Sequence, residues 1–398
     1  MRQICILIVL ATSLLISMET LADTVGFPAT ASTSAKEAQI HGHDWQGLTG
    51  TWNGLRNTME ENGITLEAVY TGEFAHNFNP GLVSNRKETI YLDNLDLTLA
   101  IDTEKAGWWS GGSFFVYGLY NHGGNPSADV IGDLQTASNI EAPDTFLIYE
   151  AWYEQHFGDD IFSLLVGWHD LNSEFYASQY SDLFLNSTLG IGPEISGNVA
   201  ISIFSKTGLA LRARIHPAES WYIQAAAYDG DPGTRSLSTS EGRMYIAEAG
   251  IEKNGNALKT GFWLHTADKT FNGTTFSQDY GYYGIIDYEL LKLNEDSSIG
   301  AFINWGAVPR ARNEIVSHFD VGLHMHGIIP TREEDDIGIA FIRANTHSGQ
   351  ESVYELTYRM VIMPWLAIQP SFQWIQNPGG TPAAPANKVS IVRFEINI

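Results

Sequence analysis

The chain has 398 residues, of which 17% are charged and 12% aromatic, and its formal net charge is −24. After the N-terminal segment it offers no apolar run of about 18 residues, which excludes membrane-spanning helices, and its acidity excludes nucleic acids as partners. The single cysteine, Cys5, lies in that N-terminal segment, so the mature chain is expected to have no disulfide, thiol catalysis or thiolate metal site.

The N-terminus has the order of a secretory signal. Arg2 supplies the positive charge, an apolar stretch follows, and small residues end at Ala22. This order predicts a signal peptide over residues 1–22, removed during export to the bacterial periplasm or outer membrane. Residues 23–44 are rich in Ala, Ser and Thr and are predicted to form a flexible leader.

Residues 45–63 are expected to form a short periplasmic helical segment. Trp52, Leu55 and Met59 fall on one helical face, and Gly63 is a natural stop, which together predict a helix over 51–62.

From residue 64 onward, apolar and polar residues alternate in runs of about ten, the length that a tilted strand needs to cross a bilayer. The clearest example is 354–376, where two such runs flank a Met363-Pro364 turn. We predict an all-β fold over 64–398: a 16-stranded antiparallel transmembrane β-barrel with short periplasmic turns, long external loops and the short N-terminal helix. The sixteen predicted strands are 64–74, 91–102, 112–121, 145–157, 161–170, 207–216, 220–229, 243–253, 257–266, 280–291, 297–306, 317–327, 336–345, 351–362, 365–376 and 388–398.

The longest predicted external loop is 171–206. Residues 199–205 within it resemble a strand, but a seventeenth strand would break the alternation of short and long connections, so we assign them to the loop. We expect this loop to fold into the lumen and narrow it; the alternative is a surface loop over the barrel mouth.

If the apolar faces point to lipid, the polar faces line the lumen. The inward side chains that we expect to line a pore are Glu150, Trp152, Glu154, Arg212, Arg214, Trp263 and Arg359. Arginines facing carboxylates can exchange ordered water for sugar hydroxyls, and aromatic rings offer a surface for stacking. The aromatic residues expected to face outward, at the membrane interfaces, are Tyr70, Tyr117, Tyr245, Tyr282, Tyr354 and Trp374.

Signals for other chemistry are weak. His324 and His326 share one strand face without an acidic partner nearby in sequence, so we predict no metal site. Hydrolase, phosphate-loop and zinc-protease motifs do not occur, so we predict neither a cofactor nor catalysis.

Several segments, in order, are similar to the carbohydrate-selective outer-membrane porins of the OprB type. They are Trp52–Arg56 with Asn62–Ile64, Gly167–Phe175, Leu183–Ser187, Tyr228–Gly230, Gly261–Thr266, Arg312–Asn313, Glu351–Arg359, Pro364–Pro370 and Asn377–Gly380. The resemblance implies a sixteen-stranded barrel that passes sugars passively. It also adds the start of the long loop, with His169, Asp170, Asn172 and Glu174, to the expected pore lining. The chain departs from outer-membrane barrels in ending with Ile398 rather than an aromatic residue.

The sequence therefore predicts an outer-membrane porin for passive diffusion of mono- or small oligosaccharides, embedded among outer-membrane lipids and lipopolysaccharide as a monomer or trimer. Three alternatives stay open: a general cation-preferring porin, a barrel enzyme such as a lipase, and a structural barrel with a plugged lumen.

Overall fold

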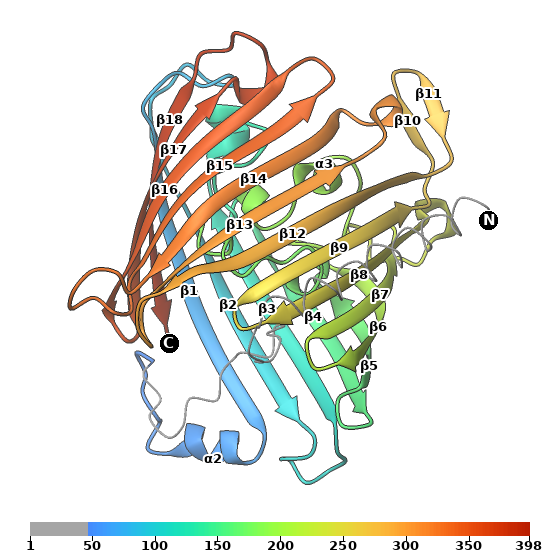
Figure 1. Ribbon diagram of the computed structural model, residues 1–398, viewed down its shortest axis with the longest axis vertical. Helices are drawn as coiled ribbons and strands as arrows, with labels where there is room; N and C mark the ends of the chain where they lie inside the picture. Colours follow the sequence, from blue (N-terminus) through green and yellow to red (C-terminus); the bar gives the residue numbers. More distant parts are fainter. Residues whose placement is uncertain (1–46) are drawn as a thin grey trace.

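The computed structural model describes residues 47–398, so the expected signal peptide and leader lie outside the described residues. Sixteen strands close into one antiparallel barrel, in which β1 pairs with β18 (Figure 1). They are β1 (Ile64–Asn77), β2 (Thr89–Asp102), β3 (Gly112–Gly123), β4 (Thr145–Phe157), β5 (Phe162–His169), β6 (Gly208–Ala218), β7 (Trp221–Asp229), β8 (Arg243–Lys253), β9 (Asn256–His265), β12 (Asp279–Lys292), β13 (Ser298–Ala307), β14 (Ile315–His326), β15 (Asp336–Thr346), β16 (Gln350–Met363), β17 (Leu366–Gln376) and β18 (Asn387–Asn397).

The predicted fold class and strand count are confirmed. Residues 199–205 form no strand and belong to the connection between β5 and β6, as predicted. Among residues 47–398, no helix combines the length and the apolar character needed to cross a membrane.

The structure adds one small element that the sequence did not predict. The strands β10 (Lys269–Phe271) and β11 (Thr274–Phe276) form a separate two-stranded sheet between β9 and β12. This hairpin projects from the upper right of the barrel in Figure 1.

The barrel closes where its two ends meet. β1 and β18 pair from Val69↔Asn397 to Asn77↔Val389, and the amide of Ile398 donates to the carbonyl of Ala68 at 2.8 Å. The short helix α2 (Leu55–Glu61) lies beside this seam, where Arg56 Nη2 donates to the carbonyl of Ile398 at 2.9 Å. The C-terminal strand is thus fully paired although it ends in an aliphatic residue.

Helix α2 begins later than predicted. Residues 51–54 form a turn instead, because Gly54 adopts φ +86°, a left-handed conformation that ends rather than extends a helix.

Along the strands of the barrel wall, successive side chains alternate between the outer and the inner face, as predicted. On β6, Leu209 and Leu211 are exposed on the outside, whereas Arg212 and Arg214 are buried on the inside. Of the predicted interfacial aromatic residues, four are 40–46% exposed: Tyr245, Tyr282, Tyr354 and Trp374.

The prediction for Tyr117 was wrong. Its hydroxyl donates to Asp96 Oδ1 at 2.6 Å, on the inner face of the wall. The reason is that β3 carries large apolar residues on both faces, so its alternation does not distinguish inside from outside.

Candidate functional site

The long loop (171–206) is attached to the inner wall by carboxylates that accept hydrogen bonds from its backbone amides and from a serine hydroxyl. Glu355 on β16 accepts from the amides of Leu185 and Asn186 at 2.9 and 3.1 Å. Asp287 on β12 accepts from Ser178 Oγ at 2.6 Å and from the amide of Gln179 at 2.9 Å. Wall and loop thereby satisfy each other's polar groups away from bulk water.

Helix α3 (Pro193–Ser196), within the long loop, carries a fully buried charge cluster. Glu194 lies 2.7 Å from His318 Nδ1 on β14, and His318 Nε2 lies 3.1 Å from Asp320. Tyr176 donates to Glu194 at 2.9 Å. The cluster fixes α3 against the wall, and Figure 1 shows α3 within the outline of the barrel.

Arg212 joins the start of the long loop to β4. It donates to both oxygens of Glu174 at 2.6 Å, to Glu154 at 3.0 Å and to Ser163 at 2.6 Å, and it is 1% exposed. Three residues expected to line the pore therefore form one buried ion cluster.

A second loop (124–144), between β3 and β4, also enters the barrel. Glu351 accepts from the amides of Leu134 and Gln135 at 2.9 and 3.0 Å, and Gln373 donates to the carbonyl of Ala137 at 2.6 Å. The two loops bond to each other where the amide of Asn139 donates to the carbonyl of Leu185 at 2.7 Å.

Sequence reasoning missed this second loop. The available signal was its apolar content: Val130, Ile131, Ala137 and Ile140 are too many apolar residues for a solvated connection, and all four are buried.

Much of the inner wall is apolar beneath the two loops. The long loop packs Leu185 and Leu189 against inward residues such as Ile342 and Val353. It also packs Phe175 and Ile195 beside Trp263 on β9. Trp263, predicted to line the pore, is 0% exposed and belongs to this packing.

One sector of the bore keeps inward side chains in contact with solvent. On β2–β4 these partly exposed residues are Asp96, Thr98, Phe115, Tyr117 and Trp152. On the other side of the seam, Arg359 on β16 donates to Glu395 on β18 at 3.1 Å. These two side chains are 31% and 25% exposed. The partly exposed inward side chains described here therefore lie on β2–β4 and on the periplasmic half of β16–β18.

The remaining predicted site residues lie around the start of the long loop. Glu150 accepts from Trp152 Nε1 at 3.2 Å and from the amide of Asp170 at 2.9 Å. Trp152 stacks on Phe115 with ring centroids 5.0 Å apart. Of these side chains, Trp152 keeps the clearest access to the bore.

The others are held by neighbouring groups. Asp170 accepts from Tyr149 at 2.6 Å, and His169 Nδ1 lies 2.8 Å from the hydroxyl of Tyr228. Asn172 donates to the carbonyl of Gly190 at 2.9 Å. Arg214 lies 4.3 Å above the ring of Tyr222.

Burial changes the acidity of the second loop. It raises the pKa of Asp133 to about 6, and it raises the pKa of Glu141 to about 7, where the charge of Asp133 adds to the effect. Both oxygens of Glu141 accept backbone hydrogens, from Ser127 at 2.9 Å and Ala128 at 3.0 Å.

The histidine pair has an acidic partner that sequence spacing did not reveal. His324 Nε2 and His326 Nδ1 lie 2.9 and 2.8 Å from Asp336 Oδ1, on the adjacent strand β15. Within residues 47–398 no group of three His, Cys, Asp or Glu side chains has an arrangement that fits a metal ion.

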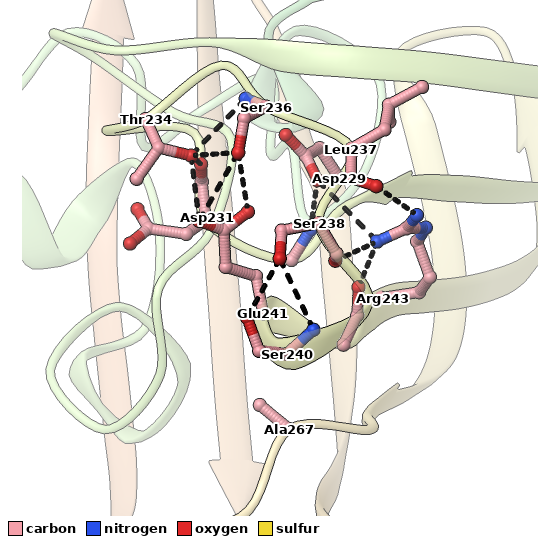
Figure 2. A network of polar contacts seen from close by, with 12 residues as sticks. Asp229, Asp231, Thr234, Ser236, Leu237, Ser238, Ser240, Glu241, Arg243 and Ala267 are labelled. Carbon is pink, nitrogen blue, oxygen red and sulfur yellow. Dashed lines mark hydrogen bonds and ion pairs between the residues drawn. The ribbon is translucent and has the colours of Figure 1, made fainter.

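The loop between β7 and β8 stays at the rim and is braced by its own polar groups (Figure 2). Ser236 and Thr234 donate to Glu241 at 3.2 and 3.0 Å, and Arg243 lies 3.7 Å from Asp229. Its groups are mostly exposed and polar, in contrast to the apolar loops that enter the barrel.

Comparison with known proteins identifies relatives of the whole barrel. A family model described as carbohydrate-selective porin, OprB family, matches residues 86–397. Porin B of Pseudomonas aeruginosa is 23% identical over 417 residues, which cover 88% of this chain and 90% of the relative.

Solved structures share the fold. The high-pH structure of Pseudomonas putida OprB matches with a TM-score of 0.81 at 20% identity, over 89% of this chain and 98% of that one. A triple mutant of the Rhodopseudomonas blastica porin matches with a TM-score of 0.55 at 9% identity, over 84% and 100% of the two chains.

Proposed function

Since the chain belongs to the OprB family of carbohydrate-selective porins, we propose that sugars diffuse through the sector of its bore next to β2–β4, with the two inserted loops forming the constriction. The barrel is a transport channel of the outer membrane, and its substrates are carbohydrates. The observation that carries the proposed path is the partial exposure of inward side chains on β2–β4, while the wall beneath the loops is buried.

The proposed path offers what a sugar needs in place of water. Asp96 and the Arg359–Glu395 pair present charged acceptors and donors, which bond sugar hydroxyls in the manner of ordered water. The stacked Phe115 and Trp152 rings present an apolar surface beside them. Passage requires only weak binding, because a tightly held solute would not leave.

The predicted pore-lining residues then divide into two roles. We propose that Trp152 and Arg359 act at the path. The other predicted residues position the long loop and the wall around it, since each is buried or bonded to the loop or wall: Glu150, Glu154, His169, Asp170, Asn172, Glu174, Arg212, Arg214 and Trp263.

We further propose that residues 1–22 are removed on export, and that outer-membrane lipid and lipopolysaccharide surround the exposed apolar wall. One chain suffices for a pore, because both constricting loops come from the same barrel. The sugar leaves chemically unchanged, since passage needs no bond to form or break.

The test is liposome swelling with the purified full-length protein. Liposomes containing the protein should swell in isosmotic glucose, and the rate should fall for larger oligosaccharides. Swelling equal to that of protein-free liposomes would refute the sugar channel.

A general cation-preferring porin is the second candidate, favoured by the net charge of −24. Single-channel recording separates the two, because a sugar path past Trp152 predicts that added glucose reduces ion conductance. Conductance that is cation-selective yet unaffected by glucose supports the general porin instead.

A further inference from the structure

Most basic side chains that turn into the bore are paired with carboxylates. Arg359 is paired with Glu395 at 3.1 Å, and Lys259 with Glu252 at 2.7 Å. The pairs Arg212–Glu174 and Arg393–Glu73 are shorter, at 2.6 and 2.5 Å, and lie away from water. Arg214, which stacks on Tyr222, is 7% exposed.

Several carboxylates in the bore have no such partner. Asp96 is held by neutral donors only, the hydroxyl of Tyr117 at 2.6 Å and Asn94 Nδ2 at 2.8 Å. Asp182, on the long loop, is exposed. Among residues 47–398 neither carboxylate forms an ion pair with a basic side chain, and Glu355 and Asp287 behind them are also bonded to neutral groups.

Next to the partly exposed aromatic side chains of β2–β4, the uncompensated charge is therefore that of Asp96, which is negative. In a narrow bore with walls of low dielectric constant, such charge attracts cations and repels anions far more strongly than it does on an open surface. This field does not act on the net charge of a neutral sugar, which is zero. It attracts an ammonium substituent on the same ring and repels a carboxylate substituent.

Asp96 also lies next to the aromatic surface. Tyr117, which donates to it, has its ring centroid 6.4 Å from that of Phe115, and Phe115 stacks on Trp152. An aromatic face favours a nearby cation, so ring and carboxylate act in the same direction.

We propose that this bore sorts sugars by charge: it passes protonated amino sugars faster than neutral sugars of equal size and excludes sugar acids, with Asp96 as a specificity-determining residue. This inference rests on the sugar-channel function proposed above. It narrows the substrate class to neutral and cationic sugars.

The experiment measures uptake of labelled glucosamine, glucose and glucuronate into liposomes containing the full-length protein, at equal KCl on both sides. Glucosamine should enter fastest and glucuronate slowest. Asp96→Asn should lower the glucosamine-to-glucose uptake ratio about fivefold, the factor for unit charges meeting at about 4 Å in water. At about 1 M salt the three rates should converge.

Asp93→Asn is the matched control. Asp93 is on the same strand, is likewise bonded to a tyrosine, Tyr70 at 2.8 Å, and pairs with Gly72 on the outer face. This variant should keep the wild-type ratios.

The outcomes separate the two proposals. If no sugar enters, the sugar-channel function fails. If glucose enters but glucosamine has no advantage, or if Asp96→Asn and Asp93→Asn change the ratio equally, only the charge-sorting inference is overturned.

Discussion

At the residue scale, Arg212 pairs with two buried carboxylates inside the barrel. Its guanidinium neutralises Glu154 and Glu174, and all three side chains are less than 10% exposed. Arg212→Ala leaves two buried carboxylates without their cation, so we expect a loss of about 3–5 kcal/mol in the free energy of unfolding. Urea titration of the protein in lipid vesicles, followed by tryptophan fluorescence, measures the change.

The control for Arg212 is an ion-paired arginine whose side chain is exposed to solvent. Arg86 lies 3.2 Å from Glu88 and is 71% exposed, so Arg86→Ala should cost no more than about 1 kcal/mol. Equal losses for the two variants would mean that burial of the Arg212 cluster does not matter.

Alternation along β6 correctly predicts that Arg212 faces inward, but not what it does there. Its partner Glu174 is 38 residues away in sequence and belongs to the loop. A period-two pattern fixes the face of a strand residue and contains no information about a loop that packs against it. This is why Arg212 was predicted to line the pore, whereas the structure buries it.

At the element scale, substitution of Glu355 tests how the long loop is attached to the barrel wall. Glu355→Ala leaves the amides of Leu185 and Asn186 without their acceptor, and each unmade hydrogen bond costs about 1–3 kcal/mol. We expect faster hydrogen exchange at these two amides and a higher, noisier single-channel conductance. Glu355→Gln keeps one acceptor oxygen and should lie between the alanine variant and the wild type; an alanine variant with unchanged exchange would contradict the role.

The second loop should respond to pH. The pKa of Asp133 is raised to about 6 and that of Glu141 to about 7, above their ordinary values in the unfolded chain. Between about pH 4 and pH 7 the folded loop thus binds more protons than the unfolded loop, so its stability falls as pH rises through this window. A spin label on Ala128→Cys should become more mobile from pH 5 to pH 8.

Asp133→Asn provides the control for this pH response. It removes one titrating group and the repulsion on Glu141, so the mobility change should shrink. Mobility that decreases with rising pH in the labelled wild-type background would reverse the predicted sign.

The elements differ in how far sequence predicts them. The strands were predicted almost to their ends, because each must present alternating faces to lipid and interior. The second loop was not predicted to enter the bore, because its partners lie some two hundred residues later in the chain. Glu351 accepts from loop amides, and Gln373 donates to the loop carbonyl of Ala137. Glu150, which was predicted to line the pore, is likewise an acceptor for the backbone at the start of the long loop.

At the scale of the whole molecule, the barrel and its two loops share one interior. Inward residues such as Ile342, Val353 and Ile391 are 0% exposed only because the loops cover them. The two loops thus occupy part of the interior that sixteen strands enclose. The acidic composition serves two purposes, since some carboxylates hold loop amides and others remain in contact with water.

This shared interior leads to a prediction about loop removal. Replacing residues 178–199 by a short Gly-Ser linker should raise single-channel conductance severalfold and abolish block by glucose, because the constriction is gone. It should also lower the temperature of unfolding, because the apolar wall beneath the loop becomes exposed to water. Removing the β10–β11 hairpin (269–276), which forms its own sheet outside the barrel wall, should change neither conductance nor glucose block. If the shortened long loop leaves conductance at the wild-type value, the narrow passage lies elsewhere and the proposed path past β2–β4 is wrong.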